Sequence, residues 1–200
     1  MLALYHMPGT RSSTVRWMLE EIGAPYEIRP VDLRQGAQRD PAFLAINPMG
    51  KLPVLDHDGA IVTEAAAICC YLADAFPAAG LAPPIGDRRR GPYLRWMFFG
   101  PTCLEAAGID RMQKREAGNP ASLGYGDLER VVETVVRGLA PGPWLLGERF
   151  SAADIVIGTG LRWGRAAATI PERPEIAFYL ERLEARPALQ RATAKDQAAA

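Results

Sequence analysis

The clearest fold signal in the first part of the chain is PVLDHDGAIV, residues 53–62. It contains two short apolar runs, 53–56 and 60–62, separated by His57-Asp58-Gly59. An Asp-Gly pair between two apolar runs is typical of a tight β-hairpin. The stretch therefore predicts two antiparallel strands joined by a short turn.

Segments on both sides of this hairpin alternate between strand-like and helical patterns. Upstream, residues 2–5 and 26–31 predict strands. Apolar residues between them fall at the helical spacing i, i+3, i+4, i+7, and Gly23 ends that helix: Val15, Met18, Leu19 and Ile22. Downstream, a second helical stripe follows Thr63, which we expect to cap it: Ile68, Tyr71, Leu72 and Ala75. The order β-α-β, crossover, β-hairpin, helix predicts a thioredoxin-like α/β domain over residues 1–77.

The second half of the chain has a different rhythm. Residues 78–92 are rich in proline and glycine, which predicts a linker. After it the strand signals vanish, and residues 128–139 and 176–183 carry helical stripes. We therefore expect an all-helical domain, a helical bundle, over residues 93–200. The fold class predicted for the whole chain is α/β followed by all-α.

One helix start in this second half is unusually well marked. Ser151 and Asp154 have the spacing of a capping box, and Phe150 and Ile155 have that of a hydrophobic staple. The helix that follows is strongly apolar. This predicts that it is the buried centre of the bundle.

Composition and charge exclude several classes of protein. The 200 residues carry 23 basic and 23 acidic side chains, so the net charge is zero and a nucleic-acid partner is not expected. No apolar run approaches a membrane span, and the N-terminus lacks the pattern of a signal peptide. Three cysteines without C-x-x-C spacing fit a reducing compartment, so we expect a cytoplasmic protein. The two histidines form no ligand cluster, which predicts that there is no metal site.

Three stretches of the first domain would converge in a thioredoxin-like fold. Residues 7–13 place three hydroxyls and an arginine at a helix N-terminus, where an anion such as a thiolate is stabilised. Residues 51–54 hold an X-Pro bond before a strand, which in the cis form would turn the Leu52 backbone outward. Residues 63–66 put Glu64 in the first turn of the next helix, where it can bind a ligand ammonium. Ordinary capping, strand-start and dipole roles remain open for all three stretches.

These stretches occur together as a set of motifs: P-G-T-R-S-S, N-P-x-G-K-L-P-V-L, T-E-A-A-A-I-C-x-Y-L and F-S-A-A-D-I-V. In order and spacing the set resembles the cytosolic glutathione transferase family, of the bacterial kind, over essentially the whole chain. The resemblance implies thiolate attack by glutathione on an electrophile. It also implies no resident cofactor, since glutathione is a co-substrate, and a role in detoxification.

The resemblance also implies roles for particular residues. Glutathione would contact a set drawn from the three stretches: Arg11, Lys51, Leu52, Pro53, Glu64 and Ala65. Ser12 is the first candidate for the hydroxyl that activates the thiol, and Thr10 is the second. A pocket for the second substrate would draw on residues for which core packing is the alternative: Met7, Phe99, Cys103 and Trp163. The partners implied are glutathione, a small hydrophobic electrophile and a second copy of the chain in a homodimer.

The sequence departs from the family pattern at two places. Ala65 stands where the family often has serine, so one hydroxyl contact is lost. Arg11 falls where the bacterial cysteine-type members carry cysteine, which argues against disulfide exchange by a protein thiolate. Two alternatives to conjugation stay open, a glutathione-dependent isomerase and a glutathione-binding protein of the same fold without catalysis.

Overall fold

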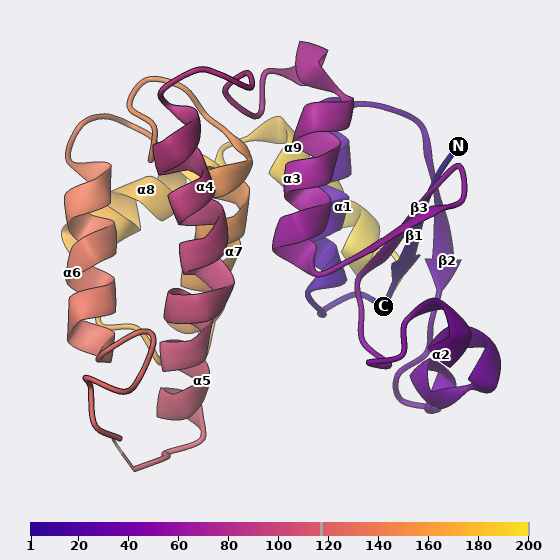
Figure 1. Ribbon diagram of the computed structural model, residues 1–200, viewed down its shortest axis with the longest axis horizontal. Helices are drawn as coiled ribbons and strands as arrows, with labels where there is room; N and C mark the ends of the chain where they lie inside the picture. The colour runs from indigo at the N-terminus through magenta and orange to yellow at the C-terminus, as the bar shows by residue number, and fades with distance from the viewer. Residues whose placement is uncertain (117, 200) are drawn as a thin grey trace. The chain divides into compact units, whose positions relative to one another are not determined.

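The computed structural model describes residues 1–116 and 118–199, which form two compact units (Figure 1). The first holds residues 1–79 and 186–199, and the second residues 80–185. The C-terminal segment thus groups with the α/β domain, whereas the sequence placed it in the helical domain of 93–200. Its helix, α9 (Pro187–Gln197), packs against α1 (Ser12–Ile22) through ion pairs between side chains far apart in the sequence.

A four-stranded sheet in the order β2-β1-β3-β4 is the frame of the first unit. Strand β1 (Leu2–His6) lies parallel to β2 (Tyr26–Pro30) and antiparallel to β3 (Val54–His57), which pairs with β4 (Ala60–Thr63). Asp58 and Gly59 both have positive φ angles, 52° and 89°, as a two-residue hairpin turn of the primed type requires. The predicted hairpin and the thioredoxin-like α/β fold are confirmed.

Helices α1 and α3 (Ala65–Ala75) pack on this sheet. The core between them is built from fully buried apolar side chains: Leu4, Met18, Leu55, Ile68 and Leu72. Helix α1 ends at Gly23 in the left-handed conformation, as predicted, with its N–H bonded to the Leu19 carbonyl. The N-cap of α3 is Glu64 and not Thr63, which is still part of β4. The expectation that Thr63 caps this helix was wrong by one residue.

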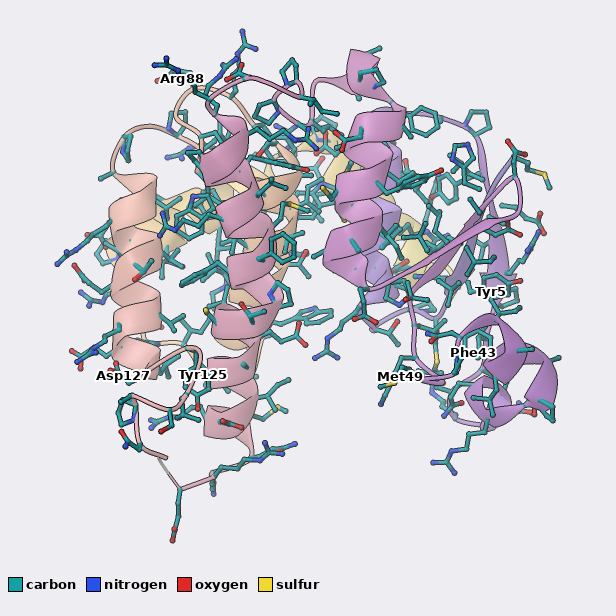
Figure 2. The ribbon with its side chains drawn as sticks, in the orientation of Figure 1. Tyr5, Phe43, Met49, Arg88, Tyr125 and Asp127 are labelled. Carbon is teal, nitrogen blue, oxygen red and sulfur yellow. The ribbon has the colours of Figure 1, made fainter. Side chains whose placement is uncertain are left out.

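A second, smaller apolar cluster anchors the crossover segment. Helix α2 (Pro41–Ile46), preceded by a 3-10 turn η1 (Ala37–Arg39), inserts Phe43 against Val31, Leu52 and Val54. The rings of Phe43 and Tyr5 meet edge to face with centroids 5.9 Å apart (Figure 2). This packing fixes the loop that leads into β3.

The second unit is helical. A 3-10 turn η2 (Pro77–Ala79) precedes it, and its helices are α4 (Arg90–Phe99), η3 (Gly100–Glu105), α5 (Ala106–Met112), α6 (Leu128–Leu139), α7 (Ala152–Ala166) and α8 (Pro174–Glu184). The segment η3 is a π-helix, and Pro101 at its start lacks the N–H that a regular ladder needs. Gly138 of α6 is required because a Cβ there would lie 2.3 Å from the Trp96 ring. The predicted helices 128–139 and 176–183 are both present.

Helix α7 has the buried start that its capping box predicts. Asp154 is fully buried and accepts hydrogen bonds from the backbone N–H groups of Ser151 and Leu145, each at 2.9 Å, and from the Tyr179 hydroxyl at 2.9 Å. Burial raises the pKa of the Asp154 carboxyl, and these hydrogen bonds oppose the rise. The carboxylate therefore joins the helix start to α8 and to the loop before α7.

We predict that Asp154→Ala lowers the free energy of unfolding by about 3 kcal/mol, because it leaves several buried donors unpaired. Thermal melts measure this as a fall in Tm of several degrees. Asp127→Ala is the matched control, since Asp127 caps α6 through the Arg130 N–H at a partly exposed position. It should cost about 1 kcal/mol. Equal losses for the two variants would contradict a buried structural role for Asp154.

Candidate functional site

A groove of about 330 Å³ opens in the first unit, and it brings together the three stretches that the sequence singled out. All six residues predicted to contact glutathione line it, together with two residues that were not predicted: Arg11, Lys51, Leu52, Pro53, Glu64, Ala65, Asn47 and Met49. Lys51 and Glu64 are exposed, so the groove presents a cation and a carboxylate to solvent. Such a groove suits a ligand that carries both charges.

The loop before β3 is shaped by Asn47, which is 3% exposed. Its side-chain amide donates to the Lys51 carbonyl at 2.8 Å and accepts from the Met49 N–H at 3.1 Å. Gly50 lies between them with φ 60°, and a Cβ there would stand 3.0 Å from the Gln38 carbonyl. The Leu52–Pro53 peptide bond that follows is cis. Asn47 and Met49 line the groove but were not predicted to do so; Figure 2 labels Met49 on this loop.

Glu64 enters the groove from an unusual backbone conformation. It has φ 67° and ψ 116°, a region that costs a non-glycine residue on the order of 1–3 kcal/mol. Ala65 then begins α3, and the first N–H groups of a helix have no partner within the helix. The groove thus holds a carboxylate directly beside a helix N-terminus. One ligand group bearing an ammonium and a carboxylate can use both.

The two candidate hydroxyls occupy different positions. Ser12 is fully buried, and its Oγ lies 2.7 Å from Thr10 Oγ1 and 2.7 Å from His6 Nδ1. Thr10 is partly exposed, and it donates to the Met7 carbonyl at 2.8 Å. Its neighbour Arg11 lines the groove. The alternative role that the sequence left open, plain capping of α1 by Ser12 or Ser13, is not found, because the N-cap is Arg11 and makes no side-chain cap bond.

A buried polar cluster lies behind these hydroxyls. Asp196 of α9 accepts from His6 Nε2 at 3.0 Å, and also from the Ser13 hydroxyl and the Arg16 guanidinium. His6 is 2% exposed and Arg16 is 7% exposed. Burial raises the pKa of Asp196, but the hydrogen bonds from His6, Ser13 and Arg16 outweigh it and hold that pKa at about 2. Nothing in the sequence indicated this cluster, because His6 and Asp196 are 190 positions apart.

The residues expected in a second-substrate pocket lie in both units. Met7, in the first, is partly buried beside the Phe43 cluster, and its Sδ accepts from the Leu33 N–H at 3.4 Å. In the second, the Phe99 ring packs against Trp96, Cys103 lies in the π-helix and Trp163 lies in α7. All three are partly buried. That these residues line one pocket stays a prediction.

In the part of the chain that the structure describes, no three His, Cys, Asp or Glu side chains are grouped to hold a metal ion. None of the described helices is long and apolar enough to cross a membrane.

The described fold agrees with that of known proteins. Residues 1–74 match the family model "Glutathione S-transferase, N-terminal domain". Glutathione S-transferase GstA of Escherichia coli O157:H7 is 30% identical, over 94% of this chain and 96% of that protein. The disulfide-bond oxidoreductase YfcG of Escherichia coli K12 is 29% identical, over 98% of this chain and 96% of that one.

Solved structures extend the likeness to the whole chain. A glutathione transferase from Methylococcus capsulatus is 36% identical with a TM-score of 0.82, covering 99% of this chain and 100% of that one. A homologue from Sulfitobacter, solved with bound glutathione, is 30% identical with a TM-score of 0.77, covering 100% and 99%. The chain belongs to the glutathione transferase family.

Because the pKa of the Asp196 carboxyl is lowered, we predict that the free energy of unfolding depends on pH in the acid range. Its pKa is about 2 in the folded protein against an ordinary 3.8, so between these values the unfolded chain binds a proton that the folded protein does not. Its contribution, on the order of 1–2 kcal/mol, is therefore complete above about pH 4 and is lost as the pH falls toward 2.

Urea unfolding of the protein and of Asp196→Asn across this pH range measures the effect. The difference between the two free energies of unfolding should shrink steadily from pH 4 to pH 2. A difference that stays constant over the whole range would show that the carboxylate carries no pH-linked stability.

Proposed function

We propose that the protein transfers reduced glutathione, as its thiolate, to a small hydrophobic electrophile. The observation that carries the proposal is the single groove in which Arg11, Lys51, Leu52, Pro53, Glu64 and Ala65 all meet. Family membership supports a glutathione transferase in general, and the groove supplies the chemistry for the tripeptide. The relative from Sulfitobacter was solved with glutathione bound, which supports the same ligand here.

Each end of glutathione has a complementary group in the groove. In the proposed pose the γ-glutamyl ammonium pairs with Glu64, and the adjacent carboxylate accepts from the N-terminus of α3 at Ala65. Lys51 takes the glycyl carboxylate. The cysteinyl part follows the Leu52 backbone, which leaves its sulfur free to approach the start of α1.

The reaction needs the thiol as thiolate. The thiol proton passes to solvent or buffer, and the sulfur electron pair then forms a C–S bond with the electrophilic carbon. In a substitution, the leaving group departs with its bonding pair. A hydroxyl that donates to the sulfur favours the thiolate and lowers the pKa of the thiol. We assign this contact to Thr10, because it is partly exposed beside a groove residue whereas Ser12 has no exposed surface.

Other glutathione chemistry would use the same groove. A glutathione-dependent isomerase adds and then releases the thiolate, and a glutathione-binding protein without catalysis needs only the binding residues. The relative YfcG is named a disulfide-bond oxidoreductase, and a glutathione thiolate can attack a substrate disulfide without any protein cysteine. These reactions are separated by testing a panel of substrates: aryl halides, enones, a cis-enone for isomerisation and a small disulfide. The readout is which of the substrates react with consumption of glutathione and which react while glutathione is preserved.

We predict that Thr10→Val raises the pKa of bound glutathione and slows conjugation at neutral pH by 10- to 100-fold, with affinity for glutathione little changed. Valine keeps the shape of threonine and removes its donor. The pKa is read from the pH dependence of thiolate ultraviolet absorbance in the complex, and affinity from calorimetry.

Glu64→Gln is the paired variant. It should weaken glutathione binding and leave the pKa of the bound thiol unchanged, because it removes an ammonium partner far from the sulfur. No heat on adding millimolar reduced glutathione to the parent protein would refute the proposal. Full activity in Thr10→Val with a loss in Ser12→Ala would reverse the assignment of the hydroxyl.

We also propose that the protein is a homodimer, which is the commonest closed assembly and the one that the family resemblance implies. Light scattering at micromolar concentration should give twice the chain mass of 21.8 kDa. A mass of one chain at that concentration would contradict the proposal.

A further inference from the structure

The buried cluster of His6, Ser12, Arg16 and Asp196 connects the C-terminal helix to the hydroxyl of Thr10, whose neighbour Arg11 lines the groove. Its members come from three elements: β1, α1 and α9. Asp196 contacts His6, His6 contacts Ser12, and Ser12 contacts Thr10, with distances of 3.0, 2.7 and 2.7 Å. The chain of contacts therefore runs unbroken from a carboxylate near the C-terminus to the partly exposed Thr10.

The direction of each proton in this chain follows from its first member. Asp196 is ionised above pH 4, so it accepts at every contact. His6 Nε2 then carries a proton, and in the neutral ring Nδ1 is an acceptor. Ser12 donates its single proton to Nδ1, so it cannot also donate to Thr10. In the contact between the two hydroxyls, Thr10 is therefore the donor or makes no bond.

Protonation of His6 reverses the hydrogen bond between the two hydroxyls. A charged ring donates from Nδ1 to Ser12, and Ser12 can then donate to Thr10. Thr10 still keeps its own proton for the Met7 carbonyl or for a ligand. With a neutral ring, a thiolate competes with Ser12 and with the Met7 carbonyl for the Thr10 proton. With a charged ring it competes with the Met7 carbonyl alone, so the charged ring favours the hydrogen bond from Thr10 to a thiolate.

Arg16 offers an alternative arrangement. Its Nη1 lies 3.3 Å from His6 Nε2, so a ring protonated on Nδ1 alone could accept from Arg16. That tautomer would set an imidazole lone pair against the Asp196 carboxylate at 3.0 Å. With the proton on Nε2, both Arg16 and His6 donate to the same oxygen, Asp196 Oδ1, and their closeness is explained. The geometry favours the Nε2 proton.

The cluster does more than dock the C-terminal helix. Other ion pairs already hold α9 to α1: Arg186 binds Glu21 at 2.6 and 2.7 Å, and Arg191 binds Glu20 at 3.0 Å. In those pairs α9 supplies the cation. At Asp196, by contrast, α9 supplies the anion, which accepts from Ser13 in the first turn of α1. Its contacts are thus at the end of α1 where the thiolate would be, and not where the helix is otherwise anchored.

We propose that Asp196 and His6 are positioning residues that orient the Ser12 and Thr10 hydroxyls, so that Thr10 donates to the glutathione thiolate. The inference rests on the proposed function, since it concerns the same thiolate. His6 and Asp196 touch no substrate and act through Ser12. The C-terminal helix is then part of the machinery that sets the acidity of the bound thiol.

The test is the pKa of glutathione bound to Asp196→Asn, read from thiolate absorbance. The chain of contacts from Asp196 through His6 and Ser12 to Thr10 is called the relay below. If the relay orients the donor, the pKa of the bound thiol should rise by about one unit in this variant. Conjugation at neutral pH should be roughly tenfold slower, as loss of an orienting partner commonly gives. Removing a negative charge near the sulfur would by simple electrostatics lower that pKa. A lowered or unchanged pKa in a folded variant overturns the proposal. Asp196→Glu should recover part of the parent value.

Arg191→Met is the matched control, because it removes an α9–α1 ion pair that does not touch the relay. It should lower stability and leave the thiol pKa unchanged. An equal rise of the pKa in this control would mean that loosening of α9, and not the relay, causes the effect.

A second measurement needs no active enzyme. The chain has two histidines, so nitrogen NMR of the labelled full-length protein resolves both rings, and His6→Asn assigns them. His6 should carry its proton on Nε2, alone or together with Nδ1. A ring protonated on Nδ1 alone overturns the relay. If the parent protein binds no glutathione thiolate while His6 shows the expected state, the proposed function fails and the hydrogen-bonded arrangement stands.

Discussion

The hydrogen bonds of the Asp196 carboxylate are the interaction on which the start of α1 and the candidate hydroxyls beside it depend. This carboxylate joins the C-terminal helix to β1 through His6 and to the first turn of α1 through Ser13 and Arg16. A carboxylate with so little exposed surface is stable as an ion because each bond replaces hydration that burial removes. The same carboxylate also holds the His6 ring, which contacts Ser12. Asp196, a residue near the C-terminus, therefore affects the geometry of the candidate active site.

The groove itself depends on backbone constraints rather than on charge. Asn47 and Gly50 shape the loop before β3, and Glu64 takes a conformation that non-glycine residues rarely adopt. These features hold Leu52 and Ala65 on one groove, although 12 positions of sequence and a hairpin separate them. Strain concentrated where ligand groups converge is a common property of binding sites. The apolar core between the sheet and α3 supplies the stability that offsets this strain.

Local patterns predicted much of the fold. The Asp-Gly turn, the Gly23 helix end and the Ser151–Asp154 capping box each depend on a few neighbouring residues, and each is present as predicted. The six groove residues were predicted through motifs that resemble a known family, and the structure brings them together. Long-range pairing was not predictable. The contacts of Asp196 with His6, and the grouping of α9 with the first unit, join segments whose own sequences give no sign of each other. For the same reason Ser12 could not be recognised as a buried link instead of an exposed donor.

We propose that a glutathione sulfur receives a hydrogen bond from Thr10, which itself contacts Ser12. The most direct measurement is a crystal structure of the protein with reduced glutathione. The sulfur should lie within hydrogen-bond distance, about 3.0–3.5 Å, of Thr10 Oγ1. The tripeptide should lie in the groove of Lys51 and Glu64, and Ser12 should still be bonded to His6. A sulfur bonded to Ser12 after that bond has broken, or a tripeptide outside the groove, would contradict it.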